Sequence, residues 1–301
     1  MENVFFIVGP TAVGKSEIAA DVASACNGEI ISADAFQIYT GLGLLTAKPD
    51  DATRNKVPHH LVGLIPLAKP MDAGRFRRLA IRAINDVISR GKQAFVVGGS
   101  GLYVRALTHG LSALPAANAA LRENLSGLSV AELLVQLAQL DPETARSIDP
   151  KNKHRIVRAV EICVLTGRPA SELRQQKAPA IEPRGVFLLR DRAELYGRID
   201  GRVETMFANG VVEEVADVGK MSATAAKTLG LTEIRELISG KISQPECIAR
   251  IQQASRRYAK RQLTWFSRQT NFEPLNLSRC GSSDAIELIT RQARLSCAER
   301  E

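Results

Sequence analysis

The chain has 301 residues, a net charge of +8 and an apolar fraction of 45%, values that are ordinary for a soluble globular protein. No apolar run approaches the roughly 18–20 residues of a membrane-spanning helix, and the five scattered cysteines exclude a disulfide framework and a C-x-x-C zinc site. Reduced cysteines and a start without the basic region of a signal peptide predict a cytoplasmic protein. The net positive charge favours an anionic partner but does not identify that partner.

The first predicted element is a strand over residues 4–8, an apolar run that ends at a glycine. A phosphate-binding motif of the form G-x-x-x-x-G-K-[ST] follows and opens a predicted helix over 16–25. Its residues are Gly9, Pro10, Thr11, Ala12, Val13, Gly14, Lys15 and Ser16. Backbone N–H groups and the helix start would hold a phosphate, Lys15 would add a charge, and the Ser16 hydroxyl suits Mg²⁺. The alternative, an ordinary glycine-rich turn, is disfavoured by the strand and helix on either side.

Strands and helices continue to alternate as far as residue 108. A short strand over 29–34 precedes a long loop rich in Gly and Pro, and further elements follow: a helix over 73–90, a strand over 93–97 and a helix to about residue 108. This order is typical of a parallel sheet with helices on its faces. We expect only helices over about 111–183, then a strand at 185–189, a helix and a helical C-terminal third. The sequence thus predicts an α/β fold: a P-loop NTPase-like parallel sheet core (1–112 and 184–301) with an all-helical insertion domain (113–183).

Two polar residues follow predicted strands of this sheet. Asp34 ends the strand over 29–34, and Ser100 comes after two glycines at the end of the strand over 93–97. Ligands of open α/β sheets bind outside the carboxyl ends of the strands, which would place both side chains beside Lys15. Asp34 is then a candidate base or metal ligand and Ser100 a candidate site hydroxyl, while the alternative for each is a helix cap or a turn. No acid follows the strand over 93–97 where ATPases usually carry one, which disfavours an ordinary ATPase.

Two basic segments could contact a polyanion. One spans residues 151–158 at the start of a predicted insertion helix. The other lies along one C-terminal helix, near Tyr258 and Trp265, and consists of Arg250, Arg257, Lys260, Arg261 and Arg268. Basic side chains flanked by aromatic ones suit a phosphate backbone with unstacked bases. A solvated helix face is the alternative for either segment alone, and both segments together with the phosphate motif favour nucleic acid.

Several motifs, in chain order, resemble those of one family, the bacterial tRNA dimethylallyltransferases, also called tRNA isopentenyltransferases. In the core they lie at residues 9–16, 32–39, 46–49, 58–60, 98–103 and 258–266, and in the insertion at 111–115 and 155–161. The match runs from residue 4 to about 268, and several of these motifs are rare outside the family. The chain departs from the family pattern at Ala35, where the family has Ser, and at Ser100, where it usually has Thr. It also departs at residues 44–45 and 231–232.

The resemblance implies transfer of a dimethylallyl group from dimethylallyl diphosphate to N6 of the adenosine 3′ to the anticodon of tRNA, with release of diphosphate. Asp34 matches the family's catalytic Asp, which removes a proton from the amine, and Ser100 and Lys15 complete the expected catalytic set. The phosphate motif would hold the diphosphate together with a Mg²⁺ near Ser16. Arg192, shortly after the strand at 185–189, is a further candidate diphosphate contact.

The resemblance also implies contacts with tRNA. The residues expected to contact the anticodon stem-loop or its flipped-out adenosine are Asp34, Ala35, Phe36, Gln37, Thr46, Lys48, Ser100, Arg122, Arg155, Arg158, Arg257, Lys260 and Arg261. We expect a monomer without membrane association. Two alternatives remain open: a P-loop kinase that phosphorylates a small molecule or nucleotide, and a non-catalytic RNA-binding ATPase. ATP turnover on a small acceptor would favour the first, and tRNA binding without any need for a prenyl diphosphate would favour the second.

Overall fold

The computed structural model describes residues 3–112, 114–175, 183–269 and 272–298. The chain divides into two compact units, a core of Met1–Thr108 with Ile181–Glu301 and an insertion of His109–Ala180. The boundaries expected from the sequence, 112/113 and 183/184, each lie a few residues further along the chain. Residues 176–182, which belong to the expected insertion, lie outside the described part of the chain.

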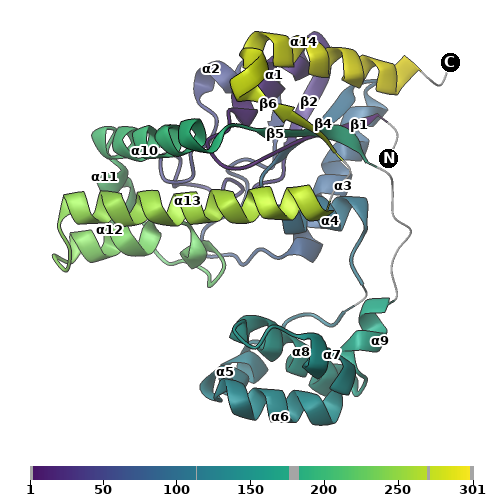
Figure 1. Cartoon of the computed structure of the whole chain (residues 1–301), viewed down its shortest axis with the longest axis vertical. Coiled ribbons are helices and arrows are strands. Elements are labelled where there is room, and N and C mark those ends of the chain that lie inside the picture. The colour runs from purple at the N-terminus through teal and green to yellow at the C-terminus, as the bar shows by residue number, and fades with distance from the viewer. Residues whose placement is uncertain (1–2, 113, 176–182, 270–271, 299–301) are drawn as a thin grey trace. The chain divides into compact units, whose positions relative to one another are not determined.

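The core is built on a six-stranded sheet with the strand order β3-β2-β4-β1-β5-β6 (Figure 1). The strands are β1 (Val4–Val8), β2 (Gly28–Ser32), β3 (His59–His60), β4 (Gln93–Gly98), β5 (Arg184–Leu189) and β6 (Glu273–Asn276). All neighbouring strands are parallel. β1, β2 and β4 are buried along their whole length, because helices cover both faces of the sheet. The carboxyl ends of these strands therefore share one edge, where the phosphate motif leaves β1.

Two hydrophobic cores lie on opposite faces of this sheet. The first contains residues of α3 (Ala73–Ser89) and α4 (Gly101–Thr108), and the second contains residues of α1 (Lys15–Ala25), α10 (Arg192–Ala208) and α14 (Leu277–Ala298). Alternate residues of β1 divide between them: Phe6 and Val8 join the first, while Phe5 and Ile7 join the second. Burial on both sides explains why β1 is apolar at every position.

A third cluster of helices supports the loop after β2. It comprises α11 (Val211–Ala216), α12 (Leu231–Ile238), the short 3₁₀ turn Ala225–Lys227 and the first part of α13 (Gln244–Gln269), and α13 lies along α10 and α12 (Figure 1). Leu42 and Leu45 of the loop are buried in this cluster. The Glu214 carboxylate accepts hydrogen bonds from the backbone N–H groups of Leu44 and Leu45, both at 2.9 Å. The cluster thereby fixes the start of the segment that continues to Thr46 and on to α2 (Asp51–Arg54).

The regular secondary structure in the described part of the insertion consists of helices, which share a hydrophobic core of their own. The helices are α5 (Ala119–Gly127), α6 (Val130–Leu140), α7 (Pro142–Ser147), α8 (Lys153–Thr166) and α9 (Ala170–Gln175). Apolar residues of α6 and α8 supply most of the core, which also includes Leu125 of α5 and Leu173 of α9. The carboxylate of Asp141, which is fully buried, accepts hydrogen bonds from the backbone N–H groups and hydroxyls of Thr144 and Ser171. It thus joins α7 to α9.

Two secondary-structure predictions were wrong. The long loop after β2 contains the short elements α2 and β3. The C-terminal third of the core was expected to be entirely helical, but residues 273–276 form β6, which pairs with β5 at the edge of the sheet. The strand is short and contains Pro274. Proline has no backbone N–H to donate to a neighbouring strand, and it is therefore tolerated in an edge strand but not in a central one. Neither length nor alternation marks such a strand in the sequence. No helix in the described part of the chain is long and apolar enough to span a membrane.

Candidate active site and nucleic-acid interface

The phosphate motif forms a loop between β1 and α1. A Cβ on Gly9 would lie 2.5 Å from the carbonyl oxygen of Leu188, so only glycine fits against β5 there. Gly14 has a φ of 101° and caps α1, a conformation that favours glycine. The Lys15 ammonium donates a hydrogen bond to the carbonyl oxygen of Pro10 at 2.6 Å. Burial lowers the pKa of Lys15 to about 8, and the positive charge of Arg202 adds to this while Asp34 opposes it.

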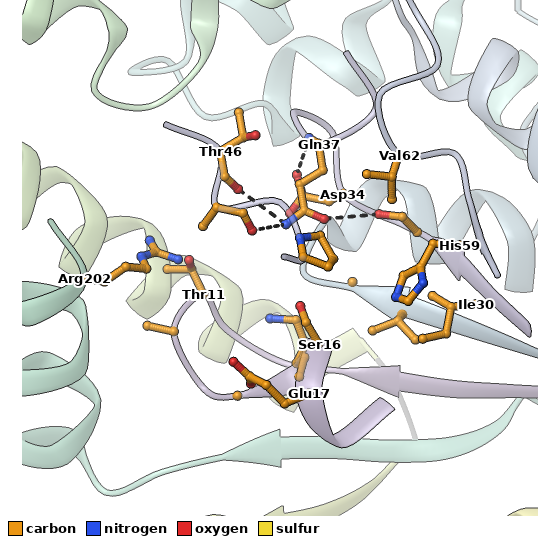
Figure 2. A pocket seen from close by; sticks show the side chains of 18 of the residues that line it. Thr11, Ser16, Glu17, Ile30, Asp34, Gln37, Thr46, His59, Val62 and Arg202 are labelled. Carbon is orange, nitrogen blue, oxygen red and sulfur yellow. Dashed lines mark hydrogen bonds between the residues drawn. The ribbon is translucent and has the colours of Figure 1, made fainter. Parts of the chain in front are cut away.

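A cavity of about 420 Å³ opens in front of this loop (Figure 2). Its lining comes from the phosphate loop, the carboxyl ends of β2 and β4, the segment 46–49 and one face of α10. The residues that line it are Thr11, Ala12, Gly14, Lys15, Ser16, Glu17, Ile30, Ser32, Asp34, Gln37, Thr46, Ala47, Pro49, His59, Val62, Val97, Gly98, Arg198, Gly201, Arg202 and Gln262. The cavity therefore brings a phosphate cradle and the predicted catalytic carboxylate into one space.

Asp34 lies at the wall of this cavity, just after β2. One carboxylate oxygen accepts hydrogen bonds from the N–H groups of Phe36 and Gln37, at 2.9 and 3.2 Å. This is the turn geometry that the sequence left open as an alternative, and it holds the carboxylate in place while the side chain still lines the cavity. The negative charge of Asp34 acts on Lys15 and Arg202, which places it opposite two cations.

Ser100 holds the Asp34 turn from behind and is not among the residues that line the cavity. Its buried hydroxyl accepts a hydrogen bond from the N–H of Ala35 at 2.9 Å. The neighbouring glycines are required by close contacts, since a Cβ on Gly99 would lie 2.2 Å from the Gln262 amide nitrogen. A Cβ on Gly101 would likewise lie 2.3 Å from the Trp265 ring. The structure therefore gives Ser100 a positioning contact rather than a place in the cavity.

The segment after the turn is stabilised by its own side chains. Gln37 lines the cavity, and its amide nitrogen donates to the carbonyl oxygen of Ala47 at 2.8 Å. Thr46 also lines the cavity, but its hydroxyl donates to the carbonyl oxygen of Leu42 at 2.6 Å. The Lys48 ammonium donates to the carbonyl oxygens of Tyr39 and Gly41. These bonds join the end of the loop to its beginning. Burial lowers the pKa of Lys48.

The structure places Arg198 and Arg202 in the cavity in place of Arg192. Arg192 is exposed at the start of α10, with its guanidinium 5.1 Å from the centre of the Tyr196 ring, and it does not line the cavity. Arg198 donates from Nε to the carbonyl oxygen of Ala12 at 2.8 Å. The Nε of Arg202 is buried and has no hydrogen-bond partner among the described residues. The i, i+4 spacing of Arg198 and Arg202 on a helix was the signal in the sequence that could have identified them.

The outer face of α13 is basic, as the sequence predicted. Arg257, Lys260 and Arg261 are exposed, and the Arg261 guanidinium lies 5.6 Å from the centre of the Tyr258 ring. A shallow hollow of about 350 Å³ on this face is lined by Lys260, Arg261, Thr264, Trp265 and Arg268. A hollow with an indole and three cations offers both charge and a stacking surface, the two features that single-stranded nucleic acids use.

The three arginines predicted in the insertion differ in their environment. Arg155 is exposed at the start of α8. Arg122 and Arg158 both donate hydrogen bonds to the carboxylate of Glu161, which is fully buried. Burial disfavours the charged form of Glu161, but these hydrogen bonds outweigh burial and lower its pKa. Arg122 and Arg158 therefore stabilise the insertion, which was not evident from the sequence because Arg122 and Glu161 are distant along the chain.

Comparisons with known proteins agree with this geometry. Residues 37–269 match the family model described as IPP transferase. The chain is 41% identical over 281 residues to a tRNA dimethylallyltransferase of Akkermansia muciniphila, which covers 93% of this chain and 96% of that protein. It is 39% identical over 282 residues to the tRNA dimethylallyltransferase of Chloroflexus aurantiacus, over 91% of this chain and 95% of that protein.

Solved structures show the same similarity along almost the whole chain. The tRNA isopentenylpyrophosphate transferase of Bacillus halodurans superposes with a TM-score of 0.74 at 32% identity, covering 99% of this chain and 98% of that one. A eukaryotic dimethylallyltransferase acting on tRNA superposes with a TM-score of 0.79 at 25% identity, over 94% and 77% of the two chains. With a family model that covers most of the sequence and relatives near 40% identity, the chain belongs to the IPP transferase family.

Proposed function

We propose that this protein transfers a dimethylallyl group from dimethylallyl diphosphate to N6 of the adenosine 3′ to the anticodon of tRNA and releases diphosphate. One observation carries the proposal: a phosphate loop with Lys15 and the Asp34 carboxylate line the same cavity. The names of the relatives, tRNA dimethylallyltransferases, support the same reaction.

The cationic side of the cavity fits the leaving group. As the allylic C–O bond breaks, negative charge accumulates on the diphosphate, and fixed donors stabilise it. The loop N–H groups, Lys15, Arg198 and Arg202 surround the space where a diphosphate would lie. Burial lowers the pKa of Lys15 to about 8, and an anion in the cavity would offset the burial of the ammonium.

The carboxylate side of the cavity fits the acceptor. N6 of adenine forms the new bond to the allylic carbon, and its proton passes to the Asp34 carboxylate. A base in a fixed position typically contributes about 10²–10⁴ in rate. The hydrogen bonds from Phe36 and Gln37 fix one oxygen of Asp34, and Ser100 fixes the neighbouring peptide. The adenosine must leave the stacked anticodon loop to reach this wall, which Gln37 also lines.

The donor set of the cavity fits Mg²⁺ bound largely through phosphate. Protein Mg²⁺ sites often use one or two oxygen ligands, with substrate phosphates and water completing the shell. Ser16 and Asp34 both line the cavity, and no cluster of three metal-binding side chains occurs among the described residues. Ser16 would hold the ion, which would neutralise part of the diphosphate charge.

The tRNA would bind along the basic surfaces of α13 and the insertion. The exposed cations of α13 and Arg155 of the insertion suit the anticodon stem-loop. We also propose that the enzyme acts in the cytoplasm, where its tRNA substrate is found, and that one chain suffices, because a single core unit contains the whole cavity.

The direct test uses purified protein, unmodified tRNA with adenosine 3′ to the anticodon, Mg²⁺ and labelled dimethylallyl diphosphate. We expect label in the tRNA, and Asp34→Asn should reduce single-turnover transfer at least about a hundredfold. Asparagine retains an oxygen for the turn hydrogen bonds, so tRNA affinity should stay unchanged and serves as the control. If the variant transferred the group at the normal rate, Asp34 would not be the base. ATP consumption on a small acceptor, without labelled tRNA, would establish the kinase alternative instead.

A further inference from the structure

Gln262 is a buried polar side chain that belongs to neither the phosphate loop nor the loop at the end of β4, yet it contacts both. It lies on α13, is 5% exposed and lines the cavity. Its side-chain oxygen accepts a hydrogen bond from the N–H of Thr11 at 2.9 Å, and its amide nitrogen donates to the carbonyl oxygen of Gly99 at 2.8 Å. One residue of α13 therefore joins the diphosphate cradle to the loop at the end of β4.

The chemistry of this bridge is specific for glutamine. The partner on one side is a backbone donor and the partner on the other side is a backbone acceptor, so the bridging group must accept and donate at once. A carboxylate only accepts, and an apolar side chain does neither. The bridge also leaves no space for a side chain at residue 99, since a Cβ there would meet the Gln262 nitrogen at 2.2 Å.

The bridge continues towards the catalytic carboxylate. Gly99 precedes Ser100, and the Ser100 hydroxyl accepts from the N–H of Ala35, the residue next to Asp34. A displacement of Gln262 would therefore move both the Thr11 peptide and the support of the Asp34 turn. The same helix carries Lys260 and Arg261, which directly precede Gln262 and are exposed on the basic face.

We propose that Gln262 is a positioning residue that couples the two substrate sites: RNA bound on the outer face of α13 fixes Gln262, and Gln262 in turn fixes the phosphate loop for diphosphate. This inference rests on the proposed function. Coupling between sites is reciprocal, so diphosphate should strengthen RNA binding by the same factor that RNA strengthens diphosphate binding.

The test measures the affinity of the full chain for inorganic diphosphate with Mg²⁺, alone and in the presence of saturating anticodon stem-loop RNA. In the unaltered protein we expect RNA to strengthen diphosphate binding about fivefold or more, within the usual range of coupling between sites. In Gln262→Met, which keeps the length of the side chain but removes both hydrogen bonds, the ratio should fall to one while RNA binds as before. Gln253→Met, at an exposed position of the same helix, is the matched control and should keep the normal ratio.

Gln262→Glu provides a second variant should the methionine variant fail to fold. It retains the acceptor for Thr11 but loses the donor to Gly99, and we expect the coupling to be lost here too. A normal ratio in either folded variant, or a ratio of one in the unaltered protein, would overturn the inference. Those results differ from failure of the proposed function, in which the unaltered protein would transfer no label from dimethylallyl diphosphate to tRNA.

Discussion

At the residue scale, the position of each arginine on α10 decides which one can hold a phosphate. Arg198 and Arg202 lie one helical turn apart and both line the cavity, whereas Arg192 begins the helix and faces solvent. The buried Nε of Arg202 has no hydrogen-bond partner among the described residues, and burial lowers the pKa of this guanidinium. An anion in the cavity would compensate for that burial, so Arg202 should contribute strongly to diphosphate binding.

We therefore expect Arg202→Gln to weaken binding of inorganic diphosphate roughly 10–100-fold, the range for loss of a charged hydrogen bond. Arg192→Gln removes the same charge from the same helix and should leave the affinity unchanged. Isothermal titration of both variants measures the difference. An equal loss in the two variants would mean that the total charge of α10 matters and that the cavity contact does not.

Residues that act within one short motif could be predicted from the sequence, and residues that act across the fold could not. The phosphate loop is a continuous segment at the end of a strand, and Asp34 ends the next strand, so their meeting follows from the topology of a parallel sheet. The Ser100 hydroxyl bonds to a peptide 65 residues away, and Gln262 bonds to Thr11 across 251 residues. The first bond joins the loops after β4 and β2, and the second depends on how α13 packs against the sheet, so both become evident only in the folded chain.

At the element scale, α13 has two faces with different tasks. Ser255, Ala259, Gln262 and Phe266 are buried, whereas Arg257, Lys260 and Arg261 are exposed. The period of the buried residues is the helical one, which is why the sequence alone could separate the basic face from the packed face. It could not indicate that the packed face ends in the cavity.

The basic face of α13 gives an ionic-strength prediction. Each phosphate contact contributes about 0.7–0.9 to the slope of log affinity against log salt. Arg257→Ala combined with Arg261→Ala should therefore weaken tRNA binding and reduce that slope by about 1.4–1.8. The charge-matched control is Arg279→Ala combined with Arg291→Ala on the exposed surface of α14. A slope equal to that of the control in filter-binding assays from low to high salt would make the α13 face an ordinary solvated surface.

Two departures from the family pattern lie against each other in the structure. Leu45 is one of the residues that replace the usual pair before Thr46, and Leu231 is one of the residues that replace the usual pair after Gly230. Both side chains are buried in the cluster around α11 and α12, and a Cβ on Gly230 would lie 3.1 Å from the Leu45 side chain. The departures thus concern how the loop leading to Thr46 packs, and both lie outside the lining of the cavity.

At the scale of the whole molecule, the alternation of strands and helices and the change to helices alone gave the fold class and the insertion. The predicted boundaries lie three to four residues further along the chain than the division between the two compact units. The edge strands could not be predicted, because β3 has two residues and β6 has four, too few for a recognisable strand pattern. Central strands buried on both faces are continuous apolar runs and could be recognised.

The edge of the sheet is also held by charge, which predicts how the core responds to acid. Glu29 of β2 is 1% exposed and accepts hydrogen bonds from Arg90 and Lys92, which follow α3, and from His60 of β3. The hydrogen bond from Arg90 outweighs burial and, with those from Lys92 and His60, holds the pKa of Glu29 well below its ordinary range. A carboxyl with a lowered folded-state pKa stabilises the fold above its unfolded value of about 4.3, and that contribution disappears as the pH falls.

Glu29→Gln should therefore lower the unfolding free energy of the core by about 1–3 kcal/mol at pH 7, since a neutral amide replaces the buried carboxylate that accepts the charged hydrogen bonds from Arg90 and Lys92. The difference from the unaltered protein should shrink as the pH falls from about 5 towards 2, because Glu29 itself then becomes protonated. The only tryptophan of the chain, Trp265, lies in the core, so its fluorescence in urea titrations reports the unfolding of that unit. Glu287→Gln, at an exposed position of α14, is the control and should follow the unaltered protein at every pH. A constant difference between Glu29→Gln and the unaltered protein across the acid range would show that Glu29 acts by its shape and not by its charge.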